Sequence, residues 1–246
     1  MKKIRLDRFL SNFGLGSRKE VRKLLKQERI SVNDKIEKNP SFHINPEKDI
    51  VKLDNEPLLY RENLYYMFNK PSGYITATRD ETLPTVMDFF VDTPFSLKLF
   101  PVGRLDIDTE GLLIITTDGQ LAHRLSHPKW NIEKEYYAVV KGDISNIDFS
   151  NYEKNGILLK KEKYRTKPFK VKVISTSPDK SELFITVSEG KYHIVKKIMN
   201  EIGFPVLYLK RVRIGNLKLD ENLKTGEFRE LTDKEVQGLK SLVNLS

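Results

Sequence analysis

The sequence predicts an α+β protein with two unequal domains. The chain has 246 residues, more than a usual single domain, and 39% of them are hydrophobic, which is enough for a buried core. Short helical and strand patterns fill the first 60 residues, whereas longer strand-like runs separated by a few helical segments fill the rest. We therefore expect a small domain at residues 1–60 and a larger mixed-sheet domain at 61–246.

Two short helices are predicted near the N-terminus. Apolar residues recur at helical spacing over 6–13 and again over 21–25, and glycines separate the two runs. Ser17 and Glu20 match the capping-box pattern, so the second helix should begin there, and a strand at 30–33 should follow it. The second helix has a basic outer face, although any solvated charged face would give the same pattern. Its cations are Arg18, Lys19, Arg22, Lys23 and Lys26.

The stretch at 54–63 is the best candidate for a linker. It is rich in Asn, Pro and charged residues and ends an alternating segment at 50–53, so we divide the chain near residue 60. Beyond the linker, apolar runs rich in β-branched and aromatic residues predict strands at 64–68, 112–116, 136–140, 169–174 and 183–187. Helical spacing predicts helices at 83–90, 121–125 and 194–202.

The composition favours some classes of function and excludes others. A net charge of +9 suits a partner that carries many phosphates, although many basic proteins bind no nucleic acid. The absence of cysteine excludes disulfides, thiolate catalysis and zinc–thiolate sites. No apolar run approaches the roughly 20 residues of a membrane helix, and the charged N-terminus does not match a secretory signal. We expect a cytoplasmic protein with no membrane partner.

Three short motifs near the N-terminus have a characteristic spacing. They are Arg5-Leu6-Asp7, Gly16-Ser17-Arg18 and Val32-Asn33. Over about the first quarter of the chain they resemble the S4 RNA-binding domain, a small α/β module. A helix N-terminus and several long cationic side chains can hold RNA phosphates. We expect the RNA contacts of this module to be Arg5, Arg8, Ser17, Arg18, Lys19, Arg22 and Lys23.

The larger domain contains four further motifs in a fixed order. They are Asn69-Lys70-Pro71-Ser72-Gly73, Gly103-Arg104-Leu105-Asp106 with Asp108-Thr109-Glu110-Gly111-Leu112, Glu133-Lys134-Glu135-Tyr136, and Glu189-Gly190-Lys191-Tyr192-His193 leading into Val195-Lys196-Lys197. From about residue 66 to 232, the chain resembles the pseudouridine synthases of the RsuA group. The resemblance implies a mixed, mainly antiparallel sheet. It also implies an isomerase that breaks the bond from the ribose to the uracil nitrogen and rejoins the ribose to a uracil carbon, without any cofactor.

The resemblance makes Asp106 the catalytic carboxylate. Spacing alone does not decide this, because Asp106, Asp108 and Glu110 alternate and could all face one cleft. A carboxylate can attack or stabilise the anomeric carbon or take a proton. Arg104 lies two positions before Asp106, so an extended backbone would put the two side chains together, with an ordinary surface salt bridge as the alternative. The family pattern adds Lys196 as a second basic partner.

The other site residues also follow from the family pattern. Tyr136 occupies the position of the family's active-site tyrosine, so we expect it to stack on the extruded base, with core packing as the alternative. Lys70 lies before Pro71 in a predicted structural loop. Further RNA contacts are expected from Lys70, Lys191, His193 and Lys197, although a solvated basic face explains Lys197 equally well.

Two positions depart from the family pattern near this motif. Ile194 replaces a common glutamine, which removes a polar group. Lys196 replaces a frequent arginine, so its pairing with Asp106 would be monodentate.

The expected substrate is small-subunit (16S) ribosomal RNA. The segments 106–109, 165–168 and 190–193 look closest to the small-subunit branch of the family, whereas 110–113 and 127–128 also resemble the large-subunit (23S) branch, which is the alternative. A ribosome-assembly factor without catalysis and a structural ribosomal component are the other classes. We expect a monomer.

No metal is expected. His123 and His127 are four residues apart, but Arg124 occupies the position where zinc proteases carry glutamate.

Overall fold

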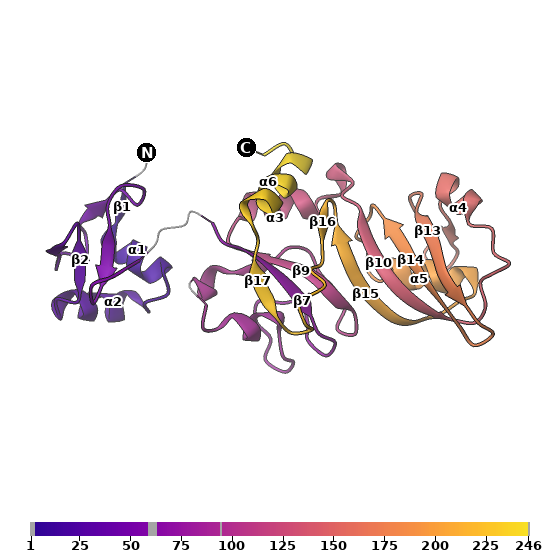
Figure 1. Cartoon of the computed structure of the whole chain (residues 1–246), viewed down its shortest axis with the longest axis horizontal. Helices are drawn as coiled ribbons and strands as arrows, with labels where there is room; N and C mark the ends of the chain where they lie inside the picture. The colour runs from indigo at the N-terminus through magenta and orange to yellow at the C-terminus, as the bar shows by residue number, and fades with distance from the viewer. Residues whose placement is uncertain (1–2, 59–62, 94, 246) are drawn as a thin grey trace. The chain divides into compact units, whose positions relative to one another are not determined.

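The chain forms two compact units in the computed structural model, which describes residues 3–58, 63–93 and 95–245 (Figure 1). The first unit comprises Met1–Leu64 together with Phe89–Leu99, and the second comprises Tyr65–Asp88 with Phe100–Ser246. The predicted division near residue 60 lies outside the described residues and stays a prediction. The inclusion of Phe89–Leu99 in the first unit was not expected, because nothing in the sequence connects this segment to the N-terminal helices.

Two helices and short antiparallel strands build the first unit. The helices are α1 (Leu6–Asn12) and α2 (Arg18–Lys26). In the described residues, β3 (Lys35–Ile36), β2 (Ile30–Val32), β5 (Val51–Leu53) and β6 (Glu56–Pro57) form one sheet in this order, and β1 (Ile4–Arg5) pairs with β4 (His43–Ile44). The capping box is confirmed, since the Glu20 carboxylate accepts from the Ser17 amide at 2.7 Å and the Ser17 hydroxyl accepts from the Glu20 amide at 3.4 Å.

A mixed sheet forms the framework of the second unit. Its strands are β7 (Tyr65–Lys70), β8 (Phe100–Pro101), β9 (Glu110–Thr116), β10 (Lys134–Lys141), β13 (Lys170–Thr176), β14 (Lys180–Val187), β15 (Val206–Ile214), β16 (Leu217–Lys218) and β17 (Phe228–Glu230). The main order is β13-β14-β10-β15-β9-β7-β17. Among the described residues, β15 with β9 is the one parallel pairing of this sheet. The predicted mixed, mainly antiparallel sheet and the α+β class are confirmed.

The parallel strands β9 and β15 approach each other closely at Gly111. Gly111 lies opposite Arg211 in the register, and its φ of +99° belongs to a region that L side chains rarely adopt. A Cβ atom at this position would lie 2.2 Å from the Arg211 carbonyl oxygen. Glycine is therefore required where β9 and β15 meet at the centre of the sheet.

Helices cover the sheet and close its core. Figure 1 shows α3 (Gly119–Ser126) and α6 (Asp233–Leu242) together near β9 and β17, and their apolar side chains share one buried cluster with those of β7 and β9. Helix α5 (Ile194–Ile202) follows β14 and buries Ile194, Val195, Ile198 and Met199. Within the described residues, no helix combines the length and the apolar character needed to cross a membrane.

Short elements complete both units. They are α4 (Ser150–Asn155), the hairpin of β11 (Leu158–Leu159) with β12 (Tyr164–Arg165), and the 3-10 helices η1 (Val86–Phe90), η2 (Ser96–Lys98) and η3 (Pro128–Trp130). The predicted helix at 83–90 is wrong over its first three residues, and the remainder is a 3-10 helix. Pro84 has no amide hydrogen, and the Thr85 amide and hydroxyl both donate to the Asp88 carboxylate, which starts the 3-10 turn only there.

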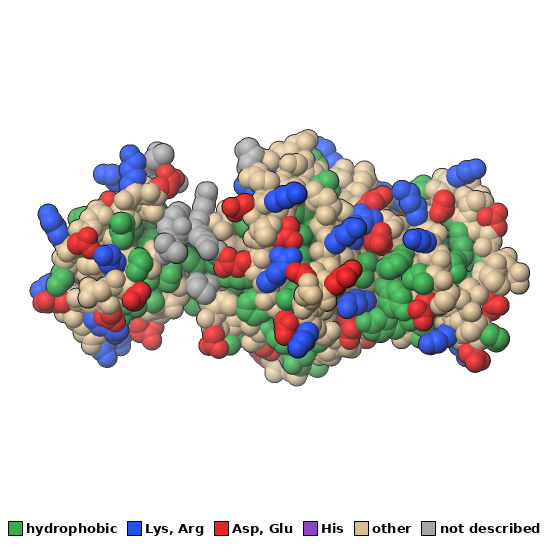
Figure 2. Space-filling view, in the orientation of Figure 1, with side chains coloured by type: hydrophobic (Ala, Val, Ile, Leu, Met, Phe, Trp, Pro, Cys, Tyr) green, Lys and Arg blue, Asp and Glu red, His purple; other side chains and the backbone are tan. Residues whose placement is uncertain are grey.

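Charge is mixed on the face of the molecule that Figure 2 displays. Lysine and arginine side chains alternate there with aspartate and glutamate, and an apolar area lies over β10 and β15. The excess positive charge of the sequence is therefore not gathered into one patch on this face.

Candidate active site

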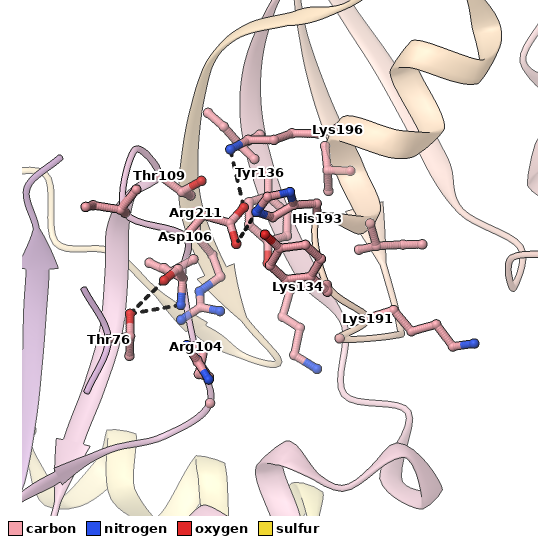
Figure 3. A pocket seen from close by; sticks show the side chains of 18 of the residues that line it. Thr76, Arg104, Asp106, Thr109, Lys134, Tyr136, Lys191, His193, Lys196 and Arg211 are labelled. Carbon is pink, nitrogen blue, oxygen red and sulfur yellow. Dashed lines mark hydrogen bonds and ion pairs between the residues drawn. The ribbon is translucent and has the colours of Figure 1, made fainter. Parts of the chain in front are cut away.

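A cleft of about 750 Å³ opens in the second unit, and we call it the Asp106 cleft. Residues 102–109 form one wall, and Lys134 and Tyr136 of β10 form another. Further lining comes from β15, from the end of α3, from residues 75–76 and from residues 190–196, which include the turn before α5 and the first residues of that helix. The cleft thus gathers three of the four motifs that carry the family resemblance (Figure 3).

Asp106 is held between two nitrogen-bearing side chains. The His193 Nε2 atom lies 3.3 Å from Asp106 Oδ1, and the Lys196 Nζ atom lies 3.3 Å from Asp106 Oδ2. The carboxylate keeps 23% of its side-chain surface exposed, so it is both oriented and accessible from the cleft. Lys196 also donates to Asp108 Oδ1 at 2.6 Å, and this hydrogen bond lowers the pKa of Asp108 below its usual value.

Arg104 does not occupy the position that its spacing predicted. In the described structure it forms no ion pair with Asp106, and Figure 3 shows its side chain directed away from that carboxylate. The prediction assumed an extended strand, but Gly103 bends the backbone with a φ of +70°, and residues 104–106 are not in a strand. The predicted pairing of Arg104 with Asp106 is therefore wrong, and His193 takes the place next to the carboxylate.

The loop that carries Asp106 is anchored on both sides of this residue. The Thr76 hydroxyl donates to the Leu105 carbonyl at 2.8 Å and accepts from the Leu105 amide at 3.1 Å. The Gly73 amide donates to the Ile107 carbonyl at 2.8 Å, and the Thr109 amide closes a turn by donating to the Asp106 carbonyl at 3.1 Å. The backbone therefore fixes Asp106 before any substrate binds, as preorganised catalysis requires.

Lys70 completes this anchoring from inside the protein. It is fully buried at the end of β7, and its ammonium donates to the carbonyls of Pro71 at 2.9 Å, Thr109 at 3.0 Å and Ile107 at 3.2 Å. Burial lowers the pKa of Lys70 to about 8. The predicted RNA contact of Lys70 is wrong, because the pairing of β7 with β9 encloses its side chain behind the loop.

The cleft contains one predicted site residue on β10 and two residues that the sequence did not single out. The predicted residue is Tyr136, which is nearly buried and lines the cleft. Lys134 lines it as well, donates to the Ile132 carbonyl at 3.0 Å, and has a pKa lowered to about 8 by burial. Arg211 is buried, its Nε atom donates to the Leu112 carbonyl at 2.8 Å, and its Nη2 atom has no hydrogen-bond partner among the described residues. Lys134 lies within a recognised motif, but no sequence signal marked Arg211.

The predicted RNA contacts of the second unit differ in their surroundings. Lys191 is exposed and extends away from Asp106 in Figure 3. Lys197 pairs with Glu162 at 3.0 Å, and His193 contacts Asp106. Their contacts with RNA stay predictions.

The predicted contacts of the first unit are mostly accessible. Arg5 pairs with Asp7 at 2.8 Å, and the Ser17 hydroxyl caps α2. The remaining five side chains are exposed, and they are Arg8, Arg18, Lys19, Arg22 and Lys23. Their contacts with RNA also stay predictions.

Two protein-family models match the chain. The model of the RNA pseudouridylate synthases matches residues 64–201, which is more than half of the chain, and that of the S4 domain matches residues 4–51. The chain belongs to the RNA pseudouridylate synthase family. As a pseudouridine synthase it is an isomerase, so the predicted enzyme class is confirmed.

This pseudouridine synthase is similar to its relatives over nearly its whole length. It is 41% identical over 233 residues to the "Uncharacterized RNA pseudouridine synthase YtzG" of Bacillus subtilis (strain 168), covering 95% of this chain and 97% of that protein. It is 37% identical over 234 residues to the "Ribosomal small subunit pseudouridine synthase A" of Escherichia coli (strain K12), covering 95% and 98%. A solved structure described as "Crystal structure of pseudouridylate synthase" matches with a TM-score of 0.66 and 38% identity, covering 96% of this chain and 99% of that chain.

Proposed function

We propose that this enzyme converts one uridine of small-subunit ribosomal RNA to pseudouridine, with Asp106 as its catalytic carboxylate. The observation that carries the proposal is the partly exposed carboxylate of Asp106 on a fully anchored loop, with His193 and Lys196 each 3.3 Å from one of its oxygens. The choice of RNA is supported by relatives named for the ribosomal small subunit at 37–38% identity over 95–96% of the chain. A ribosomal RNA substrate would place the enzyme in the cytoplasm.

The reaction requires no external donor or acceptor of electrons. The bond between ribose C1′ and uracil N1 breaks, the base turns, and a bond forms between C1′ and C5. The proton lost from C5 is balanced by one gained at N1, so the product is an isomer. A carboxylate in the position of Asp106 serves as a nucleophile toward C1′ or as a base for the C5 proton.

The surrounding residues have supporting roles in this proposal. Lys196 and His193 orient the carboxylate, and Tyr136 supplies a ring against which the extruded base stacks. A uridine in structured RNA must leave its stack to reach Asp106, as in other enzymes that act on bases. The cleft of about 750 Å³ lies within the usual range of small-molecule sites.

The test is to map pseudouridine in RNA treated with the purified enzyme. Transcripts of small- and large-subunit ribosomal RNA, with and without ribosomal proteins, would be incubated with enzyme and analysed by carbodiimide-dependent stops of reverse transcription. Asp106→Asn should abolish the stop. Asp108→Asn is the matched control, because it removes a second carboxylate that contacts Lys196, and it should leave the stop in place.

Each outcome has a distinct meaning. An Asp106-dependent stop in small-subunit RNA supports both parts of the proposal. A stop only in large-subunit RNA overturns the choice of RNA and keeps the catalytic role. Tight binding with no stop in any RNA overturns the catalytic role and favours an assembly factor.

A further inference from the structure

An exposed aromatic ring at the edge of the Asp106 cleft has no role in the mechanism above. Tyr192 is 73% exposed and is one of the residues that line this cleft. It lies in the turn between β14 and α5, next to His193. Because so much of its ring faces solvent, Tyr192 contributes little to the buried core of the domain.

The backbone holds the Tyr192 ring flat against its neighbour. The centroids of Tyr192 and His193 lie 3.6 Å apart, with the planes inclined by 21°. Consecutive side chains do not face each other in a regular helix or strand, so this stack depends on the turn. His193 has a φ of +55°, an uncommon backbone conformation for a residue other than glycine. The same His193 ring contacts Asp106.

One cation lies near the exposed ring, and a second belongs to the preceding residue. The Lys197 ammonium, which also pairs with Glu162 at 3.0 Å, lies 5.7 Å from the centroid of Tyr192. On the other side in sequence, Lys191 is exposed, and its ammonium lies 3.1 Å from the centroid of Tyr164. The Tyr164 hydroxyl donates in turn to the buried Glu189 carboxylate at 2.7 Å, so the ring that Lys191 contacts is itself held in place.

Proteins bind unpaired nucleotides with exposed aromatic rings that have cationic side chains nearby. The π-face of a base stacks on the ring regardless of base identity, while ammonium groups contact the phosphates on either side. When a uridine is extruded toward Asp106, the nucleotide beside it loses its own stacking partner. The continuous series Asp106, His193, Tyr192 leads from the carboxylate to the edge of the cleft, where that neighbouring base would lie.

We propose that Tyr192 is the stacking site for the unpaired nucleotide adjacent to the target uridine, with Lys191 and Lys197 contacting its phosphates. The proposal rests on the proposed function only in naming this nucleotide as the neighbour of the reacting uridine. Binding of an unpaired base to the ring requires no catalysis and is measured separately.

The experiment compares binding of two probes by variants of the full chain. The probes are fluorescent octauridylate and an octamer of the same backbone without bases. Tyr192→Ala should weaken octauridylate binding by about fivefold to a hundredfold, whereas Tyr192→Phe, which keeps the ring, should bind within about twofold of wild type. The octamer without bases should bind wild type and Tyr192→Ala equally. Ile174→Ala is the matched control, because Ile174 is an exposed apolar residue of β13 outside the cleft lining.

Two results would overturn the proposal. One is equal binding of octauridylate by wild type and Tyr192→Ala, and the other is a loss in Tyr192→Phe as large as that in Tyr192→Ala. If octauridylate binding depends on the ring while no ribosomal RNA is modified, the stacking site stands and the proposed function fails. If ribosomal RNA is modified and the ring is dispensable for octauridylate binding, the proposed function stands and the stacking site fails.

Discussion

Replacement of Lys70 by methionine tests whether the buried ammonium positions the catalytic loop. Methionine fills a similar volume but donates no hydrogen bonds, so the Ile107 and Thr109 carbonyls lose a charged donor. Each such bond contributes about 1.5–3 kcal/mol. The ammonium also has a burial cost of about 3 kcal/mol, which is the free-energy equivalent of a pKa lowered from 10.5 to about 8. The burial cost offsets only part of the contribution of the hydrogen bonds, so Lys70→Met should be less stable than wild type near neutral pH by a few kcal/mol at most, roughly 1.5–6.

The effect of Lys70→Met on catalysis is measured on the folded variant, separately from its effect on stability. A displacement of a reacting group by about 1 Å costs on the order of a hundredfold in rate, and Asp106 lies next to the carbonyl groups that Lys70 holds. We expect kcat to fall by about tenfold to a hundredfold with little change in KM. The assay is single-turnover pseudouridine formation on the mapped RNA. Lys172→Met, which removes an exposed lysine of β13, should retain wild-type kcat.

The pH dependence of stability provides an independent check on the charge state of Lys70. The pKa of Lys70 is about 8 in the folded chain, whereas in the unfolded chain it has its ordinary value of 10.5. The unfolded state therefore binds more protons between these values, and the contribution of Lys70 to the free energy of unfolding increases with pH.

The magnitude follows from these two pKa values. From pH 7.5 to 9.5, wild type should gain roughly 2 kcal/mol relative to Lys70→Met in urea unfolding. Lys134 has a similarly lowered pKa but is present in both proteins, so its effect cancels. A pH-independent difference between the two proteins, or an unchanged kcat, would refute the reasoning.

Three further predictions concern Lys196, Gly111 and Ser17. Lys196→Met removes the shared partner of Asp106 and Asp108, so kcat should fall at least about tenfold, and Lys196→Arg should recover most of it; equal loss in both variants would contradict this. Gly111→Ala places a Cβ atom 2.2 Å from the Arg211 carbonyl oxygen, so its urea midpoint should show a loss of more than about 3 kcal/mol. Gly119→Ala, with open space around the new methyl group, should cause no such loss. Ser17→Ala removes the cap of α2 and should cost about 1 kcal/mol in thermal unfolding, with Ser17→Asp restoring it; an unchanged transition would exclude the cap as a stabilising contact.

Local patterns predicted the elements that are apolar runs rich in β-branched and aromatic residues. Residues 136–140 and 183–187 are such runs, and they lie in β10 and β14. The strand β15 was not predicted, because Lys210, Arg211 and Arg213 interrupt its apolar pattern. Burial of Arg211 depends on its neighbours in the folded sheet, and these are set by pairings between distant segments that no local window contains.

Among the site residues too, those within motifs were predicted better than those whose surroundings come from remote parts of the chain. The motifs brought Asp106, Lys196 and Tyr136 to one cleft as expected. The positions of Lys70 and Arg104 were predicted wrongly, because both depend on how loop 103–109 runs relative to the rest of the fold. The contact of His193 with Asp106 was not predicted, because the two residues are remote in sequence. A buried lysine and an exposed one look alike in a sequence, and only the enclosing strands distinguish them.

The parallel contact of β9 with β15 also determines when the enzyme acquires its activity during synthesis. The buried cluster of the first unit that runs from Leu6 to Val51 emerges from the ribosome early, so this part of the unit is able to fold first. The loop carrying Asp106 follows, but its partners on α5 and the strand that meets Gly111 are made much later. Closing so long a stretch of chain delays this part of the fold. We therefore expect a nascent chain to acquire its S4 domain well before its active site.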